Sequence, residues 1–196
     1  MPDNAPRLLM VAHATPRPVS DGPNGRLWRF VTQFAKRGHL KLLTLIDRPI
    51  NQHDWRTIHD AAPDTMLVRR GRLARYARLP HALDALLDEA PFHMTVLSAP
   101  SLMSLRHALP QAPIAVDFAG CRARPGLAQH ADATPDFALL DHPDTAGPTI
   151  DAVPPQRRLT GPPETVAPDL VARLYADPRA DKIAAPVQPT FARRAA

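Results

Sequence analysis

The fold is decided by residues 8–46, LLMVAHATPRPVSDGPNGRLWRFVTQFAKRGHLKLLTLI. The first five residues are all apolar and are followed by a stretch broken by prolines, which is typical of a strand buried on both faces of a parallel sheet. From Arg26 onward the apolar side chains follow the helical period, and Gly38 lies where such a helix would stop. A second apolar run fills residues 42–46. This succession predicts a βαβ unit.

The same alternation continues, more weakly, toward the C-terminus. Further strands are predicted over 65–69, 93–99, 114–118 and 137–141, and further helices over 51–61, 82–89 and 101–109, the last capped by Ser101. The sequence therefore predicts a Rossmann-like, doubly wound α/β domain with a mostly parallel sheet over residues 6–145. Residues 146–196 are predicted to form a proline-rich extension with one helix over 166–176 and a mobile tail.

Composition excludes several classes of protein. The chain has 196 residues, of which 44% are hydrophobic and 22% charged, so it can bury a core and is not wholly disordered. Its 24 prolines against 8 glycines exclude a bundle of long helices. No apolar run approaches the ~20 residues of a membrane span. The first residues lack the pattern of a secretory signal, so cytoplasmic residence is expected.

Basic residues are concentrated in the first part of the chain. Residues 1–80 hold 14 Lys and Arg against 6 Asp and Glu, and five of the arginines fall within ten residues: Arg69, Arg70, Arg72, Arg75 and Arg78. An amphipathic arginine segment suits anionic lipid headgroups, whereas aromatic residues, at 5%, are too few to favour nucleic acid. A solvated arginine face is the alternative without a function.

Cysteine and histidine give little support for catalytic or metal chemistry. The single cysteine, Cys121, excludes an internal disulfide. Arg122 and Arg124 could lower the pKa of its thiol, but a lone cysteine without a placed histidine is more often inert. The nine histidines show no metal-ligand spacing. No metal and no cofactor is expected.

The loop SDGPNG at residues 20–25 is the strongest local candidate for a ligand site. It joins a buried strand to a helix N-terminus, where free backbone N–H groups and the helix dipole suit phosphate or sugar hydroxyls. Arg26 and Arg29 at the start of the helix favour an anionic ligand. The alternative is that the glycines and prolines merely shape a connection.

Several segments follow one another in an order that resembles the N-terminal half of family 4 glycosyltransferases of GT-B fold. The resemblance is strongest to the bacterial sugar transferases associated with PEP-CTERM exosortase systems. It covers mainly residues 7–60 and rests on these features: Pro16 and Pro18, the residues Ser20, Asp21 and Gly22, then Arg26, AKRGH at 35–39, LIDRP at 45–49, HDW at 53–55 and AVDF at 115–118.

The resemblance implies a domain that binds the acceptor, with transfer taking place in a cleft against a separate half that binds the nucleotide-sugar. Gly22 would then face the donor diphosphate, Arg26 would lie beneath it, and Asp117 would face the cleft from a central strand. Asn24 and Gly25 of the same loop complete the predicted substrate-binding residues. Where many relatives carry a histidine near the end of the fourth strand, this chain has the residues VLS at 96–98. The donor half is missing from these 196 residues, so catalysis by the chain alone is not expected.

Two classes of function follow. The first is a glycosyltransferase-like domain in polysaccharide or glycoconjugate synthesis, truncated relative to the family and paired with a separate donor-binding chain, whose ligand is a nucleotide-sugar or glycan. The second is a non-catalytic Rossmann-like binding or scaffold protein, with the arginine segment as a contact to the membrane surface.

Overall fold

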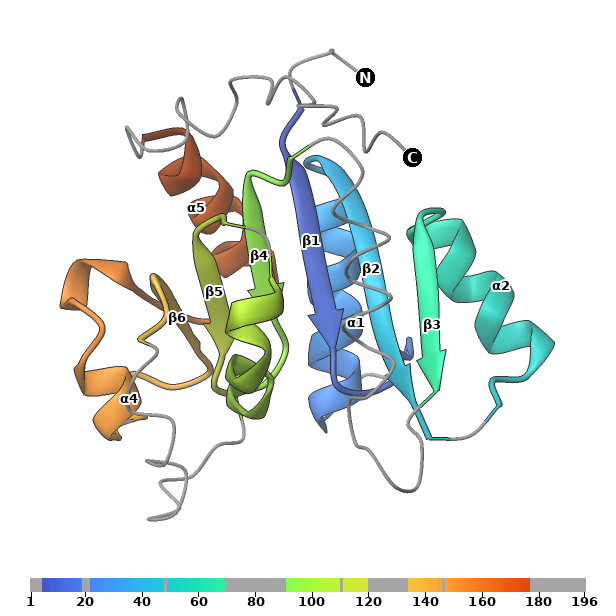
Figure 1. Cartoon of the computed structure of the whole chain (residues 1–196), viewed down its shortest axis with the longest axis horizontal. Coiled ribbons are helices and arrows are strands. Elements are labelled where there is room, and N and C mark those ends of the chain that lie inside the picture. The colour runs from blue at the N-terminus through green and yellow to red at the C-terminus, as the bar shows by residue number, and fades with distance from the viewer. Residues whose placement is uncertain are drawn as a thin grey trace, which may run out of the picture.

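The computed structural model describes residues 5–18, 22–47, 49–69, 91–109, 111–119, 134–145 and 147–176. Its centre is a seven-stranded sheet of order β3-β2-β1-β4-β5-β6-β7, in which every neighbouring pair is parallel (Figure 1). The strands are β1 Arg7–Ala12, β2 His39–Ile46, β3 Thr65–Arg69, β4 Met94–Leu97, β5 Ile114–Asp117, β6 Phe137–Leu140 and β7 Arg158–Thr160. The predicted Rossmann-like α/β class is confirmed.

Helical elements cover both faces of this sheet. They are α1 Gly22–Ala35, α2 Gln52–Ala61, the 3-10 helix η1 Pro100–Ala108, α4 Pro148–Asp151, the short 3-10 helix η3 Pro155–Arg157, and α5 Pro163–Ala176. On one face, Phe30 of α1 and Leu170 of α5 pack with Leu8 of β1. On the other face, Leu102 of η1 packs with Leu9 of β1. Successive residues of β1 thus feed two separate cores, which explains its unbroken apolar sequence.

The sheet and its core extend past residue 145, the predicted end of the domain. β7 adds a strand parallel to β6, and α5 packs against α1. Leu159 and Leu170 are buried in the same core as the first strand. Residues 148–176 are therefore part of the α/β unit. The sequence pattern does not indicate β7, because this strand has only three residues and prolines lie close to it on both sides. The predicted tail from residue 177 lies outside the described residues.

Several helix starts differ from their predictions, the first being that of α5, which begins at Pro163 rather than at residue 166. The predicted Ser101 cap is wrong: η1 begins at Pro100, and Ala99 occupies the cap position without a side-chain hydrogen bond. Helix α1 begins at Gly22, four residues earlier than the apolar period indicates; residues 22–24 are exposed and carry no apolar repeat, so the pattern does not reveal them. The helix predicted over 82–89 lies outside the described residues.

His93, just before β4, makes the start of the sheet sensitive to acid. Its Nδ1 accepts a hydrogen bond from the backbone N–H of Arg7 at 3.0 Å. Burial, and next the positive charge of Arg7, lower the pKa of His93 below its usual 6.5. The folded protein therefore binds this proton less readily than the unfolded chain, so stability is lost as the pH falls through 6.5 toward the lower folded value.

We accordingly expect the melting temperature to fall between about pH 7.5 and about pH 5.5, and to fall less in His93→Gln, which has no ring to protonate. Differential scanning calorimetry on both proteins measures this difference. An identical pH dependence in the two proteins contradicts the role given to His93.

Candidate functional site

The carboxyl ends of the strands lie at one edge of the sheet. The strand order identifies the point on that edge where a ligand is expected to bind. From β1 the chain extends the sheet through β2 to β3 on one side, and β4 to β7 extend it on the other. In open α/β sheets, ligands bind outside the carboxyl ends at the point where the strand order reverses. Here that point lies between β1 and β4.

A histidine and a serine contact each other at this point, between β1 and β4. His13 directly follows β1 and Ser98 directly follows β4; His13 Nδ1 lies 2.7 Å from Ser98 Oγ. The backbone N–H of His13 donates to the same oxygen at 2.8 Å, and the backbone N–H of Ser98 donates to the carbonyl of Val11 at 3.0 Å. Because Ser98 Oγ already accepts one hydrogen bond, the pattern favours donation of its own proton to Nδ1. The neutral imidazole then carries its ring proton on Nε2.

The sequence prediction missed this pair. The nine histidines show no metal-ligand spacing that would single out His13, and the resemblance marks residues 96–98 only as a place where a histidine of the relatives is absent. The structure brings a histidine to that strand end from β1 instead. A signal was available: both residues directly follow buried strands, and the carboxyl ends of adjacent parallel strands lie side by side.

Arg26 and Asp117, two predicted site residues, are joined in a buried ion pair. Arg26 Nε lies 3.2 Å from both carboxylate oxygens, and Nη2 lies 3.1 Å from Oδ1. Nη1 donates to the carbonyl of Gly161 at 3.1 Å, and the guanidinium carbon lies 4.9 Å from the centre of the Phe30 ring. Both residues are only 8% exposed.

The pair connects three parts of the carboxyl edge. Arg26 lies in the second turn of α1, Asp117 ends β5, and Gly161 follows β7. Burial raises the pKa of the Asp117 carboxyl, while the charge and hydrogen bonds of Arg26 act in the opposite direction. The resemblance places both residues toward a ligand, but the structure directs them at each other. This geometry favours a role in holding the edge together.

Residues 22–25, the described part of the predicted loop at 20–25, form the first turn of α1. Gly22 has a φ of +80° and no atom within 4 Å of where a Cβ would stand, so its surroundings are open. Gly22 and Asn24 are exposed, whereas Gly25 is buried. Gly22 and Asn24 are therefore accessible to a ligand, and Gly25 is not.

A cavity of about 400 Å³ adjoins this turn at the carboxyl ends of β1 and β2. Ala14 and Thr15, which directly follow His13, form part of its wall, and Asn24 is the one predicted site residue among the described residues that line it. Arg17 pairs with Asp54 at 3.5 Å across its rim. The remaining polar lining residues are Asp47 and Asn51. Such a mixture of donors and acceptors suits a ligand rich in hydroxyl groups.

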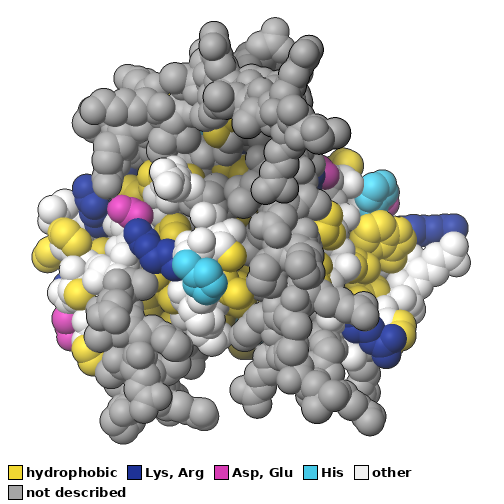
Figure 2. All heavy atoms as spheres, in the orientation of Figure 1, with side chains coloured by type: hydrophobic (Ala, Val, Ile, Leu, Met, Phe, Trp, Pro, Cys, Tyr) yellow, Lys and Arg dark blue, Asp and Glu magenta, His cyan; other side chains and the backbone are white. Residues whose placement is uncertain are grey.

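The arginine segment is described only in part. Arg69 is exposed at the end of β3; the predicted contacts Arg70, Arg72, Arg75 and Arg78 lie outside the described residues, as does Cys121. Figure 2 shows one face of the molecule, on which the described Lys and Arg side chains are spread out rather than gathered into one patch. None of the described helices is long and apolar enough to cross a bilayer.

Within the described ranges, no three His, Cys, Asp or Glu side chains come together as a metal site would require. No family model matches the chain, and no curated protein matches it either.

Proposed function

We propose that the chain is a glycosyltransferase-like sugar-binding domain whose ligand lies at the carboxyl edge, between His13 and the cavity beside α1. The observation that carries the proposal is the contact between His13 and Ser98 at the point where the strand order reverses. Ser98 is buried and hydrogen-bonded through its backbone and its hydroxyl, so it fixes the orientation of the imidazole. His13 is then a positioned partner for a ligand hydroxyl.

The cavity supports a sugar rather than an apolar ligand. Ala14, two residues after the end of β1, is one of its lining residues. The other lining residues include amide, carboxylate, hydroxyl and guanidinium groups. A sugar presents several hydroxyls that both donate and accept, and such a ring of polar groups can satisfy them. In this proposal a nucleotide-sugar or glycan binds here, and a separate chain supplies the donor-binding half that the resemblance implies.

Isothermal titration calorimetry with UDP-, GDP- and dTDP-sugars and with short glycans tests the proposal, first with this chain and then with a candidate donor-binding chain. We expect saturable binding that weakens about tenfold in His13→Gln, which loses one hydrogen bond to the ligand. Ser98→Ala should weaken it about threefold, since only the orientation of His13 is lost. His107→Gln removes an exposed histidine from η1 and should bind like the natural protein.

Absence of binding to every sugar in both settings contradicts the proposal. So does an equal loss in His13→Gln and His107→Gln, because the effect would then not belong to the site.

A scaffold function is the second candidate, and it is favoured by the mutual burial of Arg26 and Asp117, two residues that a donor site would keep available. A scaffold should keep its biological activity in the Ser98→Ala and His13→Gln variants, provided that these remain folded.

Contact with a membrane surface through Arg69 and the residues that follow is tested by flotation with anionic and neutral vesicles. Equal binding to both kinds of vesicle contradicts an electrostatic mechanism.

A further inference from the structure

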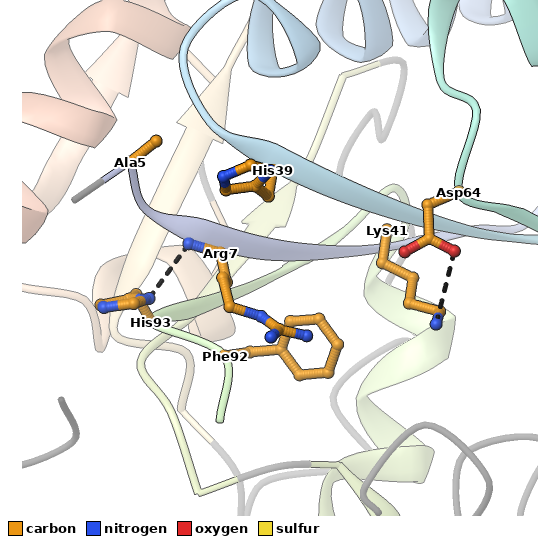
Figure 3. A pocket seen from close by; sticks show the side chains of 7 residues that line it. All are labelled: Ala5, Arg7, His39, Lys41, Asp64, Phe92 and His93. Atoms are coloured by element: carbon orange, nitrogen blue, oxygen red, sulfur yellow. Dashed lines mark hydrogen bonds and ion pairs between the residues drawn. The ribbon is translucent and has the colours of Figure 1, made fainter. Parts of the chain in front are cut away.

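A second cavity, of about 460 Å³, lies at the opposite end of the sheet, where the strands begin (Figure 3). Its described lining consists of Ala5, Arg7, His39, Lys41, Asp64, Phe92 and His93. Four of these seven side chains carry nitrogen groups that donate hydrogen bonds or can be protonated, and only one carries a carboxylate. This composition is unlike that of the cavity at the carboxyl edge.

The register of the sheet brings the basic side chains together. Arg7 is paired with His39 across β1 and β2, and Leu9 is paired with Lys41. Residues paired in register, and alternate residues along a strand, point to the same face of a sheet. Arg7, His39 and Lys41 therefore share one face, although His39 and Lys41 lie 32 and 34 positions after Arg7 in the chain.

The guanidinium of Arg7 is held in position by its surroundings. Its carbon lies 5.6 Å from the centre of the Phe92 ring, and Phe92 is itself buried. Figure 3 shows the two side chains lying together on the same side of the β1 ribbon. A guanidinium packed on an aromatic ring keeps its N–H groups in a fixed plane, which suits the oxygens of an anion.

Lys41 brings a second positive charge that is almost fully removed from water. Its side chain is 10% exposed, and its Nζ lies 3.4 Å from Asp64 Oδ1; the Asp64 side chain is 64% exposed. The buried partner of this pair is therefore the cation, and the carboxylate extends into solvent. The described lining residues together carry a net positive charge even when both histidines are neutral. The positive charge of Arg7 also contributes to lowering the pKa of His93.

We propose that this cavity binds the phosphate group of a small phosphorylated molecule, held by Arg7 and Lys41 with the imidazoles of His39 and His93 beside them. A phosphate offers three oxygens to N–H donors, and an Arg fork combined with a Lys point charge is a recurrent way to hold it. The cavity is several times larger than a phosphate, which leaves room for the organic part of the ligand. The site is separate from the proposed sugar site, so either can fail without the other.

The test is an NMR titration of the full chain with inorganic phosphate at constant ionic strength, followed through the ring resonances of His39 and His93. We expect saturable shifts in both rings, with a dissociation constant in the millimolar range, and no saturable shift with chloride. Glycerol phosphate should bind more tightly than inorganic phosphate, because it also fills the remaining volume.

Variants of opposite expected sign make the test sharp. Arg7→Gln and Lys41→Met should each weaken phosphate binding about tenfold, as expected for the loss of a charged hydrogen bond. Asp64→Asn should tighten binding about threefold, because it removes the carboxylate that competes for Lys41. Lys36→Gln removes a positive charge from the turn after α1, outside the cavity, and should bind like the natural protein.

Linear shifts without saturation overturn the proposal, as do equal shifts with chloride and phosphate. Weaker rather than tighter binding in a folded Asp64→Asn variant also overturns it.

Discussion

Arg26→Met is expected to lower the free energy of unfolding by about 3 to 5 kcal/mol at neutral pH, because it leaves the Asp117 carboxylate buried without its partner. The guanidinium makes all three of its described contacts inside the protein, with Asp117, the carbonyl of Gly161 and the ring of Phe30. Urea unfolding followed by circular dichroism measures the loss.

Two further variants identify the cause. Replacing both charges, in Arg26→Met with Asp117→Leu, should recover at least half of the lost stability, since no unpaired charge then remains in the core. Arg29 lies on the same helix, but Arg29→Met breaks only a surface ion pair with Glu164. The charged atoms of this pair are 3.8 Å apart, and both side chains are more than 40% exposed. Arg29→Met should change the stability by less than about 1 kcal/mol. Equal losses for Arg26→Met and Arg29→Met contradict the assignment.

The loss in Arg26→Met should also depend on pH in a defined direction. Burial already raises the pKa of Asp117, and removing Arg26 takes away the opposing charge. The Asp117 carboxyl of the folded variant then binds a proton more tightly than that of the unfolded chain. Protonation of Asp117 therefore stabilises the folded variant at low pH, and this contribution is lost as the pH rises through the raised pKa of Asp117. The difference from the natural protein should therefore be smaller near pH 4.5 than near pH 7, as repeated urea titrations would show.

Gly38→Ala is expected to lower the free energy of unfolding by about 3 kcal/mol, at the upper end of the usual range for overpacking. A Cβ on this residue would stand 2.3 Å from the carbonyl oxygen of Pro6, a backbone atom that also accepts the N–H of His39 at 2.9 Å. Neither strand can move away without losing that hydrogen bond at the start of the β1–β2 ladder. Thermal unfolding measures the loss.

The control separates a backbone clash from a side-chain clash. The same Cβ would also approach the Pro6 ring at 3.0 Å, so Pro6→Ala tests whether the ring causes the problem. We expect Gly38→Ala combined with Pro6→Ala to remain as unstable as Gly38→Ala alone, because the carbonyl is still present. Recovery of stability in the combination would instead assign the effect to the proline ring.

Gly38 also illustrates what a sequence pattern can and cannot predict. Its position after the apolar period correctly indicates where the first helix stops. The usual reason for glycine at such a place is a left-handed backbone, yet among the described glycines only Gly22, Gly147 and Gly161 have a positive φ. Gly38 is needed because a neighbouring strand passes too close, and a single sequence carries no signal of that approach.

The same distinction applies to the sheet and to the two sites. Strand β1 and the second half of β2 are predictable because burial on both faces favours unbroken or nearly unbroken apolar runs. β7 is not predictable, since only its central residue is buried. Arg26 and Asp117 could be placed at the correct edge, but their pairing joins residues 91 positions apart. The basic cavity depends on the register between β1 and β2, which no local pattern specifies.

The packing of α1 against α5 has a consequence for how the protein reaches its native state. The apolar side of the first helix is completed by residues near position 170, and Arg26 is anchored to a carbonyl at position 161. As the chain leaves the ribosome, the apolar surface that α5 covers remains exposed until nearly all of the described sequence has been made. Long-range contacts of this kind slow folding and prolong the exposure of apolar surface. The order of the elements along the chain thus delays the completion of this core until α5 has been made.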